Sequence, residues 1–177
     1  MILTNTGKIY TFGYNIHGQL GLGDTDNRNI PTLLNFEFDG IPSDIQLGQH
    51  QSLILTNKNK LYSFGQNNYG QLGLGDNDDR YIPTLLDFEF DGKPVDIQMG
   101  DYHSIIFTDT DKVYSFGRNI DGQLGLGDTE DKNNPMIIED FSVLTPYVLT
   151  LSQNLLEAGF IEVNEEKIIL PYSKNFE

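Results

Sequence analysis

The stretch GQLGLGDTD at residues 18–26 returns as GQLGLGDND at 70–78 and as GQLGLGDTE at 122–130. A loop this rich in glycine could hold a phosphate, bind a metal ion or form a structural turn. A catalytic loop is normally needed once in a chain, whereas a structural turn is needed in every repeat. Three near-identical copies therefore favour an architectural role.

The whole chain around this loop is periodic. Phe12, Phe64 and Phe116 lie in YTFG, YSFG and YSFG and recur every 52 residues, with no insertion or deletion. When residues 12–48 are compared with 64–100, 27 of the 37 pairs are identical. Such a long constant register indicates tandem duplication.

Each period contains four candidate strands. In KLYSFG (60–65), Leu61, Ser63 and Gly65 point to one side and Tyr62 and Phe64 to the other, which is typical of a strand. The segments SLILT (52–56), DIQLG (44–48) and PTLLNFEF (31–38) are interpreted in the same way, and turn-forming residues separate them. No helical spacing appears before residue 140. Four short strands in a period near fifty predict an all-β chain of four-stranded antiparallel propeller blades.

These segments also carry a family resemblance. LYSFGQNNYGQLGLGD (61–76), IPTLL (82–86) and DIQMGDYHSIIFT (96–108) resemble the repeat of the regulator of chromosome condensation family, and the match covers residues 1–138. Members of that family fold as propellers of about seven four-stranded blades. The family usually has Trp where this chain, which contains no Trp, has Phe12, Phe64 and Phe116. We expect the three phenylalanines to keep the aromatic packing role.

The glycine loop lacks the features of a phosphate site. A dinucleotide loop needs G-x-G-x-x-G at the start of a helix, and no helix is predicted here. A P-loop needs Lys and Ser or Thr after its glycines, whereas Asp24, Asp76 and Asp128 stand there. A phosphate would therefore meet carboxylates.

Calcium is the stronger rival, because acidic side chains lie two residues apart in each copy, as in Asp24 and Asp26. However, an EF-hand loop needs an oxygen ligand at its fifth position, which is Arg28, Arg80 or Lys132 here. The pattern favours an internal Asp–Arg pair instead. The expected roles are structural: positive φ or close approach for the glycines, blade packing for Leu20 and Leu22, and a turn cap for Asp24.

The histidines are interpreted as structural. His50 and His103 follow Gly48 and Gly100, are treated as equivalent repeat positions, and are expected to hydrogen bond at a strand start. His17 has no counterpart in the other repeats and is expected on an exposed loop. No period combines a unique acid, base and nucleophile. We therefore predict no catalytic, cofactor-binding or metal-binding residue, and no cofactor.

Composition excludes several classes of partner. The 177 residues include 11 Lys and Arg against 26 Asp and Glu, for a net charge of −15. This acidic surface argues against direct nucleic-acid contact and against anionic membranes. There is no cysteine, no signal peptide and no apolar run long enough to span a bilayer. We expect a soluble intracellular protein, cytoplasmic or nuclear.

The two ends differ from the middle. LTNTGK (3–8) aligns with LTNKNK (55–60), so the first blade is expected to lack its first strand, and the repeat register ends at Pro135. About two and a half blades result, which form an open arc. Residues 1–138 are assigned to the repeats and 139–177 to a C-terminal cap or tail, with a helix over 146–158 and a hairpin made by FIEV and KIIL. A homo-oligomer is the alternative way to cover the ends of the arc.

The predicted function follows from these surfaces. Propellers without a catalytic constellation usually present loops to a protein partner, so we predict a non-enzymatic protein–protein interaction module whose partner is unknown. The resemblance implies one alternative, a guanine-nucleotide exchange factor for a small GTPase, and no residue can be assigned to that activity. A non-functional remnant of a full propeller is the other alternative.

Overall fold

The computed structural model describes residues 1–138, 160–163 and 166–169. The chain divides into two compact units, Met1–Val143 and Leu144–Glu177. The described residues form strands, turns and loops, without a helix.

The first unit contains three antiparallel sheets. The first sheet has three strands, β1 (Ile2–Leu3), β2 (Ile9–Gly13) and β3 (Arg28–Leu33). The second has the order β4 (Pro42–Leu47), β5 (Gln51–Thr56), β6 (Leu61–Gly65) and β7 (Arg80–Leu85). The third has the order β8 (Pro94–Met99), β9 (His103–Thr108), β10 (Val113–Gly117) and β11 (Lys132–Ile137). The predicted all-β blades are confirmed.

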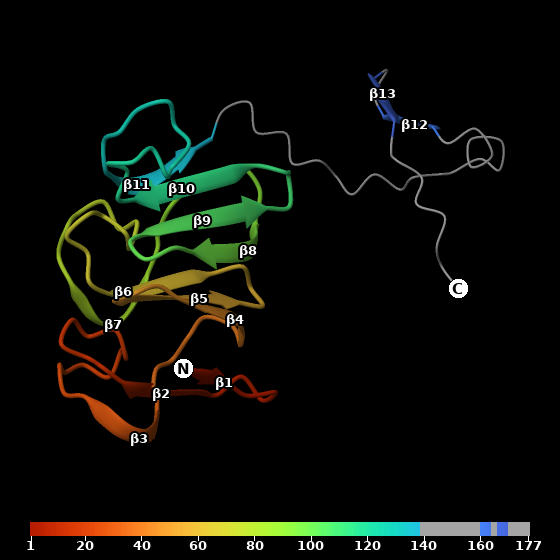
Figure 1. Ribbon diagram of the computed structural model, residues 1–177. Coiled ribbons are helices and arrows are strands. Elements are labelled where there is room, and N and C mark those ends of the chain that lie inside the picture. The colour runs from red at the N-terminus through yellow and green to blue at the C-terminus, as the bar shows by residue number, and fades with distance from the viewer. Residues whose placement is uncertain (139–159, 164–165, 170–177) are drawn as a thin grey trace, which may run out of the picture. The chain divides into compact units, whose positions relative to one another are not determined.

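The sheets are stacked in chain order, and the long loops after β2, β6 and β10 gather on one side of the stack (Figure 1). Two apolar cores hold the stack together. Ile9 and Leu34 of the first repeat pack with Ile54, Tyr62 and Phe64 of the second sheet. A second core of eight buried residues joins the second and third sheets: Leu53, Leu55, Leu61, Leu86, Ile97, Ile106, Tyr114 and Phe116. Each sheet therefore depends on its neighbour for burial.

The predicted alternation in KLYSFG does not appear as alternating exposure. Every residue of β6 is buried, because β6 is a central strand of the middle sheet and both of its faces are covered. The polar side chain of Ser63 is accommodated by donating a hydrogen bond of 2.8 Å to the carbonyl of Leu72. A sheet covered on both sides needs no polar face.

The strand predicted over 31–38 is too long, since β3 ends at Leu33. Phe36 and Phe38 instead leave the first sheet and contact Tyr62 of the second sheet edge-on, with ring centroids 5.7 and 5.1 Å from it. The hydroxyl of Tyr62 accepts a hydrogen bond from the backbone N–H of Asp39. Packing against the next sheet thus ends the strand that alternation alone would continue.

In the second unit, β12 (Phe160–Val163) and β13 (Glu166–Ile169) pair antiparallel, so the predicted hairpin is present. The helix predicted over 146–158 lies outside the described residues. The described part of the chain contains no helix of the length and hydrophobicity needed to span a bilayer.

Candidate interaction site

The glycine loop is the contact between successive sheets. Gly18, Gly21 and Gly23 have φ values of 75°, 73° and 84°, a region that favours glycine. A Cβ on Gly21 would lie 2.8 Å from the ring of Phe64 in the second sheet, and the N–H of Gly23 donates to the carbonyl of Tyr81 at 2.8 Å. The expected positive φ and close approach are both confirmed. The loop is a joint between blades.

A buried asparagine holds each loop in shape. In the second repeat, the Asn67 side chain accepts the N–H of Leu72 at 2.9 Å and donates to the carbonyl and carboxylate of Asp76. Asp76 Oδ1 also accepts the N–H of Asp78, and Asp24 Oδ1 accepts that of Asp26 in the same way, which is the turn cap predicted for Asp24. Asn15 and Asn119 have the same roles in the other repeats.

The carboxylate of each loop is paired with a cation four residues later. Asp24 pairs with Arg28, Asp76 with Arg80, and Asp128 with Lys132. The hydrogen bond from Arg28 lowers the pKa of Asp24, and burial opposes this effect. The predicted internal ion pair is confirmed. These carboxylates are occupied by their own loop, and the described residues contain no group of three or more metal-ligating side chains.

The expected packing of the three phenylalanines holds for two of them. Phe64 and Phe116 are 0% exposed, because Gly21 and Gly73 of the preceding loops lie against their rings. Phe12 is 41% exposed, and this part of the prediction is wrong. Among the described residues, no glycine loop lies against the ring of Phe12.

Six side chains form a continuous row across the loop ends of the three sheets: Tyr14, His17, His50, Tyr69, Tyr102 and Arg118. We call this set the aromatic row. It begins at the first sheet, where the His50 ring lies 5.7 Å from Tyr14 and 5.1 Å from His17 between centroids. The His50 ring then lies 6.4 Å from that of Tyr102. The row thus passes from one sheet to the next.

The other end of the row carries its cation. The rings of Tyr69 and Tyr102 meet edge-on at 5.5 Å. The guanidinium of Arg118 lies 5.5 Å from the Tyr69 ring and 5.9 Å from the Tyr102 ring, within reach of cation–π attraction. Tyr102 also donates a hydrogen bond to Gln49. These rings are thus held by one another.

The histidine predictions need two corrections. Gln51 pairs with Gly65 as His103 pairs with Gly117, so His103 corresponds to Gln51 and not to His50. His17 is only partly exposed, since its Nδ1 lies 3.3 Å from Asp79 Oδ2 across the joint.

Burial lowers the pKa of both His50 and His103. The charge of His17 lowers the pKa of His50 further, whereas Asp101 partly offsets the effect at His103. Both rings are therefore held neutral near pH 7.

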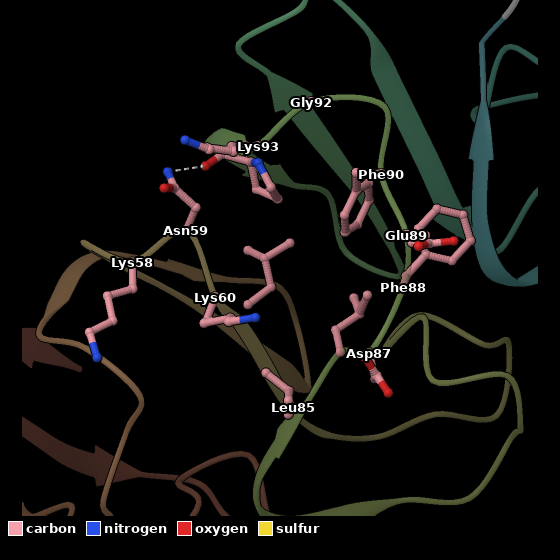
Figure 2. A pocket seen from close by; sticks show the side chains of 13 residues that line it. Lys58, Asn59, Lys60, Leu85, Asp87, Phe88, Glu89, Phe90, Gly92 and Lys93 are labelled. Atoms are coloured by element: carbon pink, nitrogen blue, oxygen red, sulfur yellow. Dashed lines mark hydrogen bonds between the residues drawn. The ribbon is translucent and has the colours of Figure 1, made fainter.

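Figure 2 shows a pocket of about 570 Å³ at the opposite ends of the strands, between the second and third sheets. One wall is the β5–β6 turn with Lys58, Asn59 and Lys60, and Asn59 donates to the carbonyl of Pro94. The other wall is the connection from β7 to β8, with Phe88 and Phe90. The charged groups at its rim do not converge on one point, so they form no acid–base pair.

The aromatic row was not predicted from the sequence. The signal for it was the variation between repeats: residues 18–24 are identical in all three copies, whereas the three positions 14, 66 and 118 are Tyr, Gln and Arg. Position 17 likewise becomes Tyr69 and Asp121.

Comparison with known proteins gives consistent matches. The model of the regulator of chromosome condensation (RCC1) repeat matches residues 6–55, 58–107 and 110–148. The ultraviolet-B receptor UVR8 of Arabidopsis thaliana is 38% identical over 138 residues, which are 78% of this chain and 31% of the receptor. The X-linked retinitis pigmentosa GTPase regulator of Mus musculus is 38% identical over 75% of this chain and 12% of its own length.

Two solved structures of the yeast protein Prp20 share the fold. The structure of yeast RCC1 (Prp20) bound to Kap60 has a TM-score of 0.72 and 25% identity, and covers 80% of this chain and 35% of that one. The structure of Prp20p from Saccharomyces cerevisiae has a TM-score of 0.71 and 26% identity, with coverage of 80% and 36%. This chain spans about a third or less of the proteins it resembles. With a repeat model matched over most of its length, the chain belongs to the regulator of chromosome condensation repeat family.

Proposed function

We propose that this chain is a non-enzymatic protein-interaction module and that the aromatic row is its binding surface. The observation that carries the proposal is the composition of the row. Tyr and Arg are the side chains most often found at interface hot spots, because they bury large areas at a low cost in conformational entropy. Three tyrosines and Arg118 gather here, on a chain that has only 11 Lys and Arg in all.

The aromatic row is also preorganised for binding. Tyr69 and Tyr102 fix one another, and both lie under Arg118, so little rotamer freedom remains to be lost on association. The Tyr14 ring, 48% exposed, is the most open member. We infer a protein partner that contacts these rings and places an acidic group near Arg118, with no direct nucleic-acid contact.

The kind of partner has support from a relative. Prp20p of Saccharomyces cerevisiae has binding properties to Gsp1p and histones, both of which are proteins. Either protein is a usable probe. Because histones are basic, a net charge of −15 would attract them without specificity, and such binding would weaken steeply with salt.

The experiment is affinity capture from cell lysate together with direct binding to purified Gsp1p and histones. Three forms are compared: the natural chain, Tyr69→Ala/Tyr102→Ala, and the control Lys112→Ala, which changes an exposed residue of the β9–β10 turn. We expect one salt-resistant partner that the control retains and that the double variant binds at least about tenfold more weakly.

Equal capture by the natural chain and the double variant would refute the row as the binding surface. A nucleotide-release assay on a purified small GTPase tests the alternative. Catalysed release of the nucleotide from that GTPase would refute the non-enzymatic proposal.

A further inference from the structure

The two joints inside the chain have the same construction. Gly21 lies against Phe64 and Gly73 lies against Phe116, and in both cases a Cβ on the glycine would be 2.8 Å from the ring. Each joint therefore has a loop half, given by the glycine loop of one sheet, and a strand half, given by the next sheet.

The hydrogen bonds of the joints repeat as well. The N–H of Gly23 donates to the carbonyl of Tyr81, and the N–H of Gly75 donates to the carbonyl of Asn133, both at 2.8 Å. A surface that matches the loop half is thus specified twice by the same sequence pattern.

The strand half of the first sheet is uncovered. Phe12 occupies the position of Phe64 and is 41% exposed, and Ile2 occupies the position of the fully buried Ile54 and is 47% exposed. Together these side chains form an apolar face with the shape that receives a glycine loop elsewhere in the chain.

The loop half of the third sheet is uncovered too. Among the described residues, a Cβ on Gly122 or Gly127 would meet no atom within 4 Å, and one on Gly125 would meet only Ile138, at 3.9 Å. On the same side, Ile105 and Phe107 are partly exposed, although the residues at these positions in the second sheet are buried. Within the described residues, the first and third sheets therefore present the two open halves of one joint.

The charges at the open halves are compatible. Inside the chain, His17 of a loop half faces Asp79 Oδ2 of a strand half. In the open halves these positions are Asp121 and Asn27. Asn27 Oδ1 accepts the N–H of Asn15 just as Asp79 Oδ1 accepts that of Asn67, so the amide Nδ2 takes the place of Asp79 Oδ2.

An amide donor is thus presented where Asp121 would arrive. An aspartate at position 27, as in the other repeats, would place its carboxylate opposite that of Asp121, and the two would repel each other.

We propose that two copies of this 177-residue chain dock head to tail, each placing the loop half of its third sheet on the strand half of the partner's first sheet. A head-to-tail contact closes a ring when its rotation allows. The three sheets of the first unit, one from each repeat, give six in a dimer, within the range of about four to eight blades that propellers use. Two equal joints would then leave no open half.

The first experiment measures mass by light scattering with size-exclusion chromatography, in moderate salt because each copy carries a charge of −15. We expect twice 20.0 kDa for the natural chain. Phe12→Lys and Phe107→Lys should each give monomer. The matched control Ile41→Lys should remain a dimer, since Ile41 is exposed outside both halves and the second repeat carries Lys93 there. A natural chain that stays at 20.0 kDa at every soluble concentration overturns the proposal.

A charge exchange tests which surfaces meet. Asn27→Asp should raise the dissociation constant about tenfold for each joint, and adding Asp121→His should restore it, more strongly near pH 6 than near pH 8. Both substitutions install residues that other repeats carry at these positions, so folding should be retained; circular dichroism checks this. Positions 27 and 121 belong to the first and third repeats, so rescue identifies a contact between copies. An unchanged dissociation constant for Asn27→Asp, or no rescue, overturns the head-to-tail contact.

Discussion

Gly73→Ala tests whether the glycine loop is a joint between sheets or only a turn. Gly73 has a φ of 71°, and an alanine there costs about 1–2 kcal/mol because its Cβ disfavours the left-handed region. The added methyl would also lie 2.8 Å from Cε2 of Phe116, which is 0% exposed and has no room to yield. Overpacking of this kind costs about 1–3 kcal/mol. We expect a total loss of about 2–5 kcal/mol in the free energy of unfolding.

Gly125→Ala is the matched control for this prediction. Gly125 has a φ of 68° in the same loop sequence, but its Cβ would meet only Ile138, at 3.9 Å. It should therefore lose only the backbone part, about 1–2 kcal/mol. Both substitutions are compared by urea unfolding in the Phe12→Lys background, which removes the proposed contact between copies. Equal losses for the two alanines would refute the joint.

Four further predictions concern burial, hydrogen bonding and pH. Phe64→Ala should cost about 3–5 kcal/mol and Phe12→Ala less than about 1 kcal/mol, because only the first ring is fully buried within one copy; thermal unfolding of the two variants in the Phe107→Lys background, which removes the proposed contact between copies, measures the difference. Asn67→Ala removes the fully buried amide that organises its loop and should cost about 2–4 kcal/mol, with faster hydrogen exchange over residues 67–79. Because burial lowers the pKa of His50, the unfolded chain binds more protons than the folded chain just below pH 6.5. The free energy of unfolding should therefore decrease as the pH is lowered below about 6.5. His50→Gln should make this decrease smaller, as measured by urea midpoints. The arginine partner lowers the pKa of Asp24, so a second loss should begin as the pH falls below the ordinary value of 3.8.

Much of the fold could be predicted because the same pattern of strand and turn residues recurs along the chain. The constant spacing of Phe12, Phe64 and Phe116 fixed the blade period, and turn residues separated the strands. Alternation failed at Phe36 and Phe38, which continue the strand pattern but pack on Tyr62 of the next sheet. No local pattern distinguishes a side chain within a sheet from one that reaches a neighbouring sheet.

The interaction surface was less accessible to sequence reasoning. The Asp24–Arg28 pair could be predicted because both residues lie in one loop. The contact of Tyr69 with Tyr102 could not, since these residues come from different turns and meet only when the second and third sheets stack. The exposure of Phe12 was missed for the same reason, because burial at that position depends on a neighbouring repeat and not on the residue itself.

The long loop that follows β2, β6 and β10 has two roles, which differ in how much the sequence varies between repeats. One part of the loop forms the joint, and another part supplies the aromatic row. The GQLGLGD segment cannot vary without disturbing a joint, because its glycines lie against the next sheet and its aspartate is paired within the loop. Positions 14 and 17, which precede it, differ between the repeats and supply Tyr14, His17, Tyr69 and Arg118 to the aromatic row. A rigid repeated frame that presents a changeable row is the arrangement expected of a binding surface. Substitutions in the row should therefore alter binding at nearly constant stability, whereas substitutions in the glycines should do the reverse.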